Sequence, residues 1–450
     1  MRKRKIRLIG APLTAVLLAA CGGSNNGFSS STPVSVAPQI AAPQSATAGS
    51  TSQYLESSFA KPRTSPRYKS LYSFKGAPDA ANPEAGLIAV KNTLYGSSES
   101  GGGNASGCYS DGCGTVFEMS TAGDEQVLYP FTAEQDGTEG PMTGLLALNG
   151  MLYGTTRLGG SASGLGYGSV FEVSKSGTGS LLYAFQGGTD GASPESNLIA
   201  LKDTLYGTTF YGGNCKGLCG RGNVFAITTS GKERVLYSFK GKHDGENPAA
   251  GLTNLNGAFY GTTLRGGAYG GGTLFKITPS GDEKVIYSFK GPPDGSFPHA
   301  GLIAVNGKLY GTTQIGGNGG PGCGRDECGT VFAASTSGQE HVLYSFKGRH
   351  HDGKYPMGGL IAVNDALYGT TSEGGGGGFE TCKTESGVGF GCGIIFKISS
   401  SGKETILHRF QGGTDGAYPV AGLLKLKGTL YGTTDAGGAN SEGTVFSLSP

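Results

Sequence analysis

The sequence predicts a seven-bladed β-propeller, and two observations carry the prediction. Three short motifs each recur seven times, at intervals of roughly 50 residues. The segments between turns are short and rich in β-branched and aromatic residues, and none shows the sustained 3.6-residue apolar period of a helix. Repeated all-β units that cannot bury an apolar face alone pack radially as blades.

Each unit carries the three motifs in the same order. The first is Leu-Tyr-Gly-Thr-Thr, which begins, with variants, at Leu94, Leu152, Leu205, Phe259, Leu309, Leu367 and Leu430. The second, typified by Gly-Thr-Val-Phe, begins at Gly114, Gly168, Gly222, Gly272, Gly329, Gly393 and Gly443. The third, typified by Leu-Tyr-Ser-Phe, begins at Leu71, Leu128, Leu182, Leu236, Ile286, Leu343 and Leu407.

One unit shows how the four strands of a blade are predicted. Asn256-Gly257 is a strong two-residue hairpin signal, because both central residues of a type I′ turn need positive φ. The expected strands are Gly251–Leu255, Ala258–Thr263, Thr273–Thr278 and Glu283–Phe289. The first strand of each unit is the most uniformly apolar, so we expect it to be innermost and buried on both faces.

Ring closure is predicted from two strands that lack a complete unit. Ser70–Phe74 reads as a lone fourth strand, and Thr444–Ser449 as a third strand with no successor. Pairing them would complete blade seven and leave no open sheet edge. The propeller is therefore expected to span residues 70–450.

The N-terminal region reads as a targeting segment. Five basic residues precede the apolar stretch Leu8–Ala20, which ends in Leu18-Ala19-Ala20-Cys21. Residues 1–20 are expected to be a lipoprotein signal peptide, with Cys21 acylated after cleavage; an ordinary secretion signal with a chance cysteine is the alternative. Gly22 favours the outer membrane of a bacterial envelope, and residues 21–69, rich in Ser, Thr, Ala and Pro, are expected to be a disordered tether.

The other eight cysteines fall into local pairs in four different units. Tight pairing in an exported chain predicts disulfides, namely Cys108–Cys113, Cys215–Cys219, Cys323–Cys328 and Cys382–Cys392. Zinc binding is the alternative, but no histidine accompanies any pair at ligand spacing. The formal net charge is +2, and loss of the signal peptide would remove five basic residues, which argues against a nucleic-acid partner. We expect a monomer without a cofactor or metal.

All four cysteine pairs lie in the loops between the second and third strands, on the same face as the Asp-Gly-x-x-Pro links between units. The link aspartates are Asp79, Asp136, Asp190, Asp244, Asp294, Asp352 and Asp415. An aspartate that caps its own turn is the favoured interpretation, and a calcium site is the alternative. His243, His350 and His351 precede such turns and are expected to be exposed, with a metal site as the alternative. Long loops on a rigid scaffold are the usual place for function.

A ligand is not seven-fold symmetric, so functional residues should break the repeat. After the link proline stand Glu84, Glu195 and His299, where the other units have apolar residues. The pair of residues before each Gly-Gly includes Arg157, Tyr211 and Arg265, and also Glu99, Phe210, Gln314, Glu373 and Asp435. Glu84, Glu195, His299, Arg157 and Arg265 are the candidates to converge on a ligand at the mouth of the central channel, with solvated loop residues as the alternative. Paired carboxylates there would suit general acid/base chemistry.

The order Leu-Tyr-Gly-Thr-Thr-x-x-Gly-Gly, Gly-Thr-Val-Phe and Leu-Tyr-Ser-Phe resembles the bacterial GloVer-type tandem-repeat β-propeller proteins, from Leu71 to Pro450. The resemblance implies a propeller on an exported, often anchored chain, and it implies no reaction. The expected function is a lipid-anchored binding or scaffold module for a protein or glycan on the loop-rich face. The alternative is a carbohydrate-active or related hydrolase or lyase that uses channel-mouth carboxylates.

Overall fold

The computed structural model describes residues 66–103, 108, 111–132, 140–160, 166–213, 218–320, 323, 328–348, 352–376, 382 and 391–450. They belong to the unit Thr64–Pro450. The expected signal peptide, Cys21 and most of the tether lie outside the described residues. No helix in the described ranges is long and apolar enough to span a bilayer.

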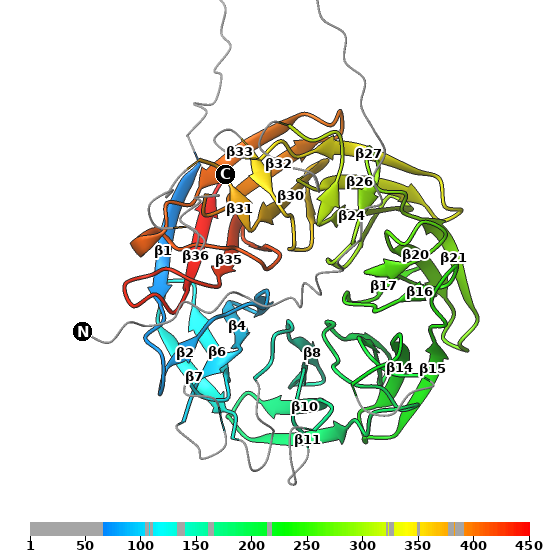
Figure 1. Ribbon diagram of the computed structural model, residues 1–450. Coiled ribbons are helices and arrows are strands. Elements are labelled where there is room, and N and C mark those ends of the chain that lie inside the picture. Colours follow the sequence, from blue (N-terminus) through cyan, green and yellow to red (C-terminus); the bar gives the residue numbers. More distant parts are fainter. Residues whose placement is uncertain are drawn as a thin grey trace, which may run out of the picture. The chain divides into compact units, whose positions relative to one another are not determined.

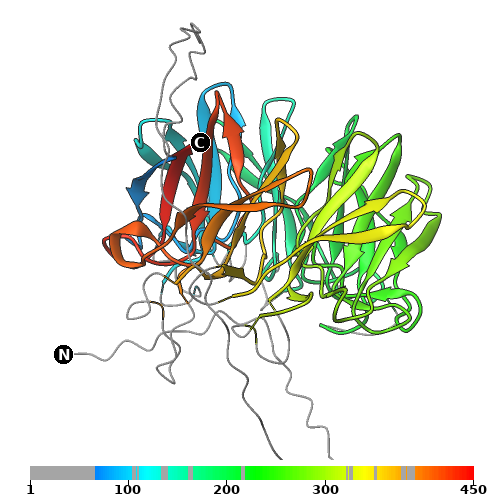
Figure 2. The ribbon, with the colours of Figure 1, turned by 90° about the horizontal axis from the view of Figure 1, so that it is seen from above.

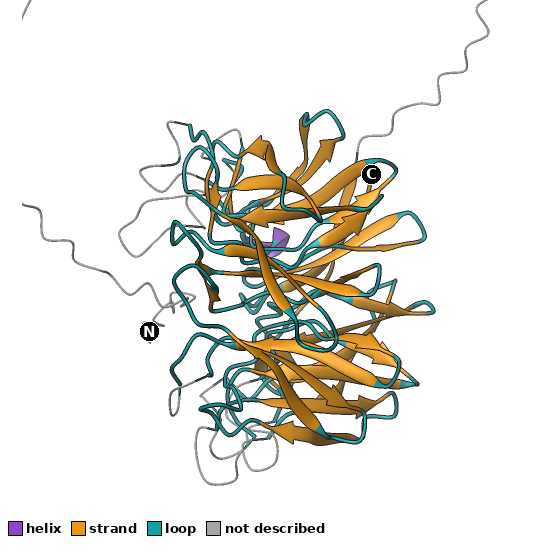
Figure 3. Cartoon of the chain, turned by 90° about the vertical axis from the view of Figure 1, so that its right-hand side faces the viewer, coloured by secondary structure: helices purple, strands orange, loops and turns teal. Residues whose placement is uncertain are grey.

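The described chain folds into seven four-stranded antiparallel sheets, which form the blades of a propeller (Figure 1). Blades 1 to 4, from inner to outer strand, are β3 (Ile88–Val90), β4 (Thr93–Ser98), β6 (Thr115–Ser120) and β7 (Glu125–Pro130); β8 (Leu146–Leu148), β9 (Met151–Thr156), β10 (Ser169–Ser174) and β11 (Gly179–Ala184); β12 (Ile199–Leu201), β13 (Thr204–Thr209), β14 (Asn223–Thr228) and β15 (Glu233–Ser238); β17 (Thr253–Leu255), β18 (Ala258–Thr263), β20 (Thr273–Ile277) and β21 (Glu283–Ser288). Blades 5 to 7 are β23 (Ile303–Val305), β24 (Lys308–Thr313), β26 (Thr330–Ser335) and β27 (Glu340–Ser345); β29 (Ile361–Val363), β30 (Ala366–Thr371), β32 (Ile394–Ser399) and β33 (Glu404–Arg409); β34 (Leu424–Leu426), β35 (Thr429–Thr434), β36 (Thr444–Ser449) and β1 (Arg67–Ser73). The strands run between the two faces of the ring, with loops at each face (Figure 3).

Blade 7 closes the ring as the sequence predicts. β1 pairs antiparallel with β36, and the register places Arg67 opposite Ser449 and Ser73 opposite Thr444. The two strands lie side by side in both views (Figures 1 and 2). β1 begins at Arg67 rather than at the predicted Ser70, because Arg67–Lys69 continue the ladder to the end of β36.

Pairs of phenylalanines join each blade to the next. The Phe of the third motif packs edge-to-face on the Phe of the second motif in the following blade, as Phe74 does on Phe117 with ring centroids 5.1 Å apart. The other pairs are Phe131–Phe171, Phe185–Phe225, Phe239–Phe275, Phe289–Phe332, Phe346–Phe396 and Phe410–Phe446. This contact also explains the central glycine of the first motif, since a Cβ on Gly96 would lie 2.4 Å from Cζ of Phe117.

The prediction that the first strand is buried on both faces is wrong. The residues of β3 are only half-buried, and the central residues of β17 and β23 are exposed. The second and third strands are instead the buried ones, as in β13 and β14. The reason is that the innermost strands line the central channel, so one of their faces meets solvent.

Two-residue ladders complete four of the blades in the described part of the chain. The links between blades pair with the loops between second and third strands in β2 (Ala80–Ala81) with β5 (Ser100–Gly101), β16 (Gly245–Glu246) with β19 (Arg265–Gly266), β22 (Gly295–Ser296) with β25 (Ile315–Gly316), and β28 (Gly353–Lys354) with β31 (Glu373–Gly374). The one helical element described is the 3₁₀ turn η1 (Gly413–Asp415). Asn256 and Gly257 have φ values of 55° and 80°, as the predicted hairpin turn requires.

Candidate functional site

The links between blades are fastened by a residue with an unusual backbone conformation. The residue before the link proline has a φ of 52° to 57° at Asn82, Ser193, Asn247, Phe297, Tyr355 and Tyr418. In blade 1 the N–H of Asn82 donates to the carbonyl of Glu442 in blade 7 at 2.9 Å, and its own carbonyl accepts the N–H of Glu99 at 3.1 Å. Positive φ is costly for a residue other than glycine, and these bonds to two neighbouring loops stabilise it.

The link and its hydrogen bonds place two residues of every blade around the opening of the central channel, which we call the channel mouth. The first directly follows the second strand and holds, from blade 1 to blade 7, Glu99, Arg157, Phe210, Leu264, Gln314, Ser372 and Asp435. The second follows the link proline and holds Glu84, Met142, Glu195, Ala249, His299, Met357 and Val420. All four acidic residues of the two sets lie in blades 7, 1 and 3, and the one arginine lies in blade 2.

Glu84 lies where the charges of four blades meet. Burial is the main cause that raises the pKa of Glu84 well above its usual value, and the negative charges of Asp435, Glu99 and Glu195 raise it further. The positive charge of Arg157 opposes them. The charges that act on Glu84 come from blades 7, 1, 2 and 3, so its side chain lies close to the propeller axis. We name Glu84, Glu99, Glu195, Asp435 and Arg157 the mouth cluster.

Asp435 is the most deeply buried member of the mouth cluster, with 3% of its surface exposed. Burial first, and then the charge of Glu99, raise the pKa of Asp435 to about 7, while a hydrogen bond from Asn82 lowers it. The Asn82 amide also donates to the Asp435 carbonyl at 3.2 Å. Near neutral pH the cluster therefore holds a carboxyl group that can give or take a proton beside others that raise its pKa.

The structure brings together Glu84, Glu195 and Arg157 from the predicted set. Arg265 is elsewhere: it is exposed and lies opposite Glu246 in the β16–β19 ladder. The sequence interpretation did not place Glu99 and Asp435 in the converging set. The sequence offers a way to find them, because they occupy the same loop position in blades 1 and 7 as Arg157 does in blade 2.

The two remaining predicted residues lie outside the mouth cluster. His299 is half-buried in blade 5, and burial lowers its pKa, so its imidazole is neutral at neutral pH. Tyr211 follows Phe210, whose ring it meets edge-to-face with centroids 4.9 Å apart. Its backbone pairs with Ala192 in the link of the same blade.

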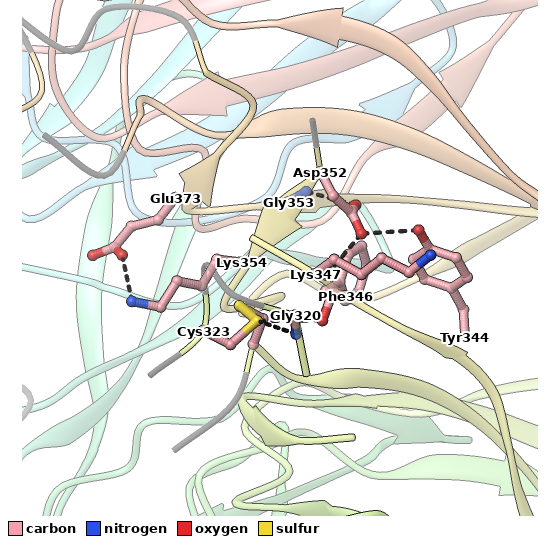
Figure 4. The surroundings of a disulfide bond; sticks show 10 residues. Gly320, Cys323, Tyr344, Phe346, Lys347, Asp352, Gly353, Lys354 and Glu373 are labelled. Carbon is pink, nitrogen blue, oxygen red and sulfur yellow. Dashed lines mark hydrogen bonds and ion pairs between the residues drawn. A yellow bond between two sulfur atoms is a disulfide. The ribbon is translucent and has the colours of Figure 1, made fainter. Parts of the chain in front are cut away.

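Disulfides hold the loops around this face. The predicted bridges Cys108–Cys113, Cys323–Cys328 and Cys382–Cys392 are present. Cys219 is also disulfide-bonded, and its predicted partner Cys215 lies outside the described residues. Figure 4 shows the surroundings of Cys323, whose Sγ accepts the N–H of Gly320 at 3.3 Å. The carbonyl of Cys328 accepts the N–H of Tyr355 at 3.0 Å, so the bridge also supports the link to the next blade.

The link aspartates cap their turns, which agrees with the favoured interpretation of this repeat. Asp294 accepts the Tyr287 hydroxyl at 2.8 Å and the N–H groups of Lys290 and Gly295 at 2.9 and 2.7 Å. Asp79, Asp190, Asp244 and Asp352 likewise accept a Tyr hydroxyl and a backbone N–H, and Asp415 bonds to His408 Nε2 and accepts the Gln411 N–H. Asp136, His350 and His351 lie outside the described residues. Within the described ranges, no group of three or more His, Cys, Asp or Glu side chains is arranged to hold a metal ion.

A sequence model of the Gloeobacter/Verrucomicrobia repeat matches residues 47–253, 163–383 and 323–450, so overlapping copies cover the whole propeller. The chain belongs to this repeat family. The Gloeobacter/Verrucomicrobia repeat thus corresponds to the blade pattern seen in the structure. No curated protein sequence matches the chain.

Solved structures similar to this repeat protein are distant. A gluconolactonase from Xanthomonas campestris has 15% identity and a TM-score of 0.39, with 67% of this chain and 86% of that chain covered. A xyloglucanase from the same species has 10% identity and a TM-score of 0.45, with coverages of 84% and 55%. An acylaminoacyl peptidase from Pyrococcus horikoshii has 8% identity and a TM-score of 0.40, with coverages of 83% and 53%. Likeness this weak carries no information about activity.

Proposed function

We propose that this protein is a binding module that holds a protein or glycan ligand at the acidic side of its channel mouth. The observation that carries the proposal is the mouth cluster, in which five charged residues from four neighbouring blades converge without repeating around the ring. The corresponding positions of blades 4 to 6 hold no Asp, Glu, Lys or Arg. A channel mouth with acidic side chains on one side only suits an asymmetric ligand.

The chemistry of the cluster narrows the ligand. Carboxyl groups accept hydrogen bonds from hydroxyl and amine groups, and a guanidinium donates to hydroxyl or carbonyl oxygens. A sugar polymer or a peptide segment with basic residues offers these partners. The positive charge of Arg157 opposes the rise in the pKa of Glu84, so it lowers the cost of gathering several carboxyl groups in one place.

A second candidate function is hydrolysis of an extracellular carbohydrate or a related polymer. One observation favours it: Asp435 has a pKa raised to about 7 next to Glu99, and the pKa of Glu84 is raised above its usual value as well. A carboxyl group that is protonated near neutral pH beside an ionised one is the pairing used in general acid/base catalysis of glycoside cleavage.

Anchoring to the envelope is part of the proposed role. The basic and apolar segment that ends at Cys21 is the sequence feature that supports lipidation. More than one acyl chain on Cys21 would give firm attachment to the outer membrane, and the residues up to the propeller would act as a tether. Intact-mass analysis of the exported protein tests this part by the presence or absence of acylated Cys21.

The experiment for the binding function uses the full-length protein in a mild detergent, on a glycan array and in a pull-down from envelope extracts. The wild type is compared with Arg157→Ala and with Lys284→Ala, a control at an exposed position on the rim strand β21. The binding proposal predicts that the same ligand is retained by wild type and control and weakened in Arg157→Ala. Cleavage of an arrayed glycan that Asp435→Asn abolishes would establish the hydrolase instead.

A further inference from the structure

Neighbouring blades meet at the outer rim through a second repeated group of side chains. At five of the seven junctions, the Glu that opens one outermost strand interacts with the Tyr and the link Asp of the preceding blade. These Tyr–Asp–Glu junctions are Tyr72–Asp79–Glu125, Tyr183–Asp190–Glu233, Tyr237–Asp244–Glu283, Tyr287–Asp294–Glu340 and Tyr344–Asp352–Glu404. Figure 4 shows Tyr344 and Asp352 of one of them.

The Asp of each junction accepts at least two hydrogen bonds, one from the Tyr hydroxyl and one from a backbone N–H. At Asp294 one oxygen accepts the Tyr287 hydroxyl and the Lys290 N–H, and the other accepts the Gly295 N–H. The one hydroxyl proton of the tyrosine is therefore donated to the Asp. At three junctions the same hydroxyl also lies close enough to the Glu to lower its pKa, namely at Glu125, Glu283 and Glu340.

The Glu of each junction has an oxygen without a partner. Within the described residues, the Oε1 atoms of Glu125, Glu233, Glu283, Glu340 and Glu404 are buried and accept no hydrogen bond. A buried, ionised carboxylate that lacks a hydrogen bond and lies beside a second carboxylate is costly in free energy. A protonated Glu avoids this cost, because it carries no charge and can donate its proton towards the tyrosine oxygen or the Asp.

A proton suits this place better than a metal ion. Each junction offers two carboxyl groups, and the hydrogen bonds above already use the Asp, whereas calcium takes six to eight oxygen ligands. Cationic side chains also face the Glu and would repel a metal ion: Lys75 at Glu125, Arg234 at Glu233, Lys240 at Glu283, Lys290 at Glu340, and Arg409 and Lys347 at Glu404.

We propose that a proton held at each Tyr–Asp–Glu junction latches two neighbouring blades, so that the ring is tightened below neutral pH and loosened above it. A proton can reach the junction of Asp294 and Glu340 from solvent, because this junction opens into a cleft of about 560 Å³ that Lys290, Pro292 and Asn318 also line. Burial first, and the charge of the Asp second, raise the pKa of all five Glu residues to about 7.

The other two junctions show what the fold does without the Glu. At one, Gly179 occupies the Glu position, and a Cβ there would lie 2.6 Å from the ring of Tyr129, which fills the space. At the other, Tyr68 occupies it and stacks on His408 with centroids 3.7 Å apart. Aromatic rings thus replace the proton-dependent contact, so the Glu is not required for blades to pack.

The pH dependence has a defined sign. A Glu whose pKa is higher in the folded than in the unfolded chain binds more protons when folded, so stability falls as pH rises from about 4.3 towards 7. The junctions are far apart along the rim, so their effects should add.

The test measures thermal unfolding of the full-length protein in mild detergent from pH 5 to 8.5. Wild type is compared with a variant in which all five junction Glu residues are replaced by Gln, with Glu340→Gln alone, and with the control Glu172→Gln on β10. Gln is neutral at every pH, so the five-fold variant should lose most of the fall in Tm seen above pH 6. Glu340→Gln should lose about one fifth of that fall, and the control should keep all of it.

Three results would overturn the proposal. The first is a wild-type Tm that does not fall between pH 6 and 8, or a fall that the five-fold variant retains. The second, should the five-fold variant not fold, is a ¹³C carboxyl titration of wild type in which the resonance lost in Glu340→Gln has a midpoint below pH 5.5. The third is stabilisation at pH 8 by 1 mM CaCl₂ in wild type but not in Glu340→Gln, which would make the junction a cation site.

Discussion

The outer rim and the channel mouth both hold buried carboxyl groups with raised pKa values, yet the two regions differ in how those groups are distributed. At the rim, the same Tyr, Asp and Glu recur at five junctions with the same causes for the shift in pKa. At the mouth, the acidic residues occupy only blades 7, 1 and 3, and one arginine from blade 2 joins them.

This difference separates architecture from function. A group that every blade can repeat serves the contact that every blade must make, which is packing against the next blade. A group that appears only once is expected to interact with a partner that is not symmetric, such as a bound ligand. The cost of gathering several carboxyl groups at the mouth is not offset by any repeated contact of the fold, and this supports the proposal that the mouth is the binding region.

Removing the closing strand should have the largest effect. A chain that starts at residue 75 loses β1 and Phe74, which is fully buried and packs on Phe117. We expect a loss of more than about 5 kcal/mol in the free energy of unfolding, enough to abolish cooperative melting. A chain that starts at residue 66 keeps β1 and is the matched control.

Similar melting curves for the two truncations would contradict the closure of blade 7 by β1. Circular dichroism and scanning calorimetry on both chains make the comparison.

Replacing a rim aspartate should have an intermediate effect. Asp294→Ala removes the acceptor of three hydrogen bonds, including that from the Tyr287 hydroxyl. We expect a loss of about 1–3 kcal/mol in chemical denaturation at pH 6, where Lys284→Ala on the neighbouring strand should change stability by less than about 0.5 kcal/mol. An Asp294→Ala variant as stable as the wild type would contradict the claim that the hydrogen bonds of the rim aspartates stabilise the fold.

A smaller effect is expected on proton binding at the mouth. The charge of Glu99 helps to raise the pKa of Asp435 to about 7, so Glu99→Gln should lower it. The folded-state pKa of Asp435 exceeds its unfolded value, so its contribution to stability is lost as pH rises from about 4 to 7, and the variant should retain more stability at pH 8. Carboxyl ¹³C titration of Asp435 in wild type and Glu99→Gln checks the shift, and an unchanged midpoint would mean that the two groups do not interact.

Much of the fold was predictable because the same sequence motifs recur in seven units. The strand order, the hairpin at Asn256-Gly257, the turn-capping role of the link aspartates and the pairing of Ser70–Phe74 with Thr444–Ser449 follow from local residue types and from the need to cover a sheet edge. The exposure of the innermost strands did not follow, because apolar content alone does not reveal that a strand lines a channel.

The mouth cluster was only partly predictable, for two physical reasons. Asp435 and Glu84 stand at opposite ends of the propeller sequence, and only ring closure brings them together. Arg157 directly follows its strand, whereas Arg265 stands one residue further along, in the ladder with β16. Successive residues of an extended chain point to opposite sides, so one position decides whether a side chain faces the mouth.

The most direct test of the account measures ligand affinity and melting temperature for one variant of each region. The probe is the glycan or peptide that the wild type retains on the array or in the pull-down, and the variants are Glu84→Gln at the mouth and Asp294→Asn at the rim. We predict that Glu84→Gln weakens binding about tenfold or more, a cost of about 1.4 kcal/mol, with Tm unchanged or raised because like charges no longer meet. Asp294→Asn should lower Tm and leave affinity intact. The reverse pattern, with binding lost at the rim and retained at the mouth, would contradict the assignment of function to the asymmetric cluster.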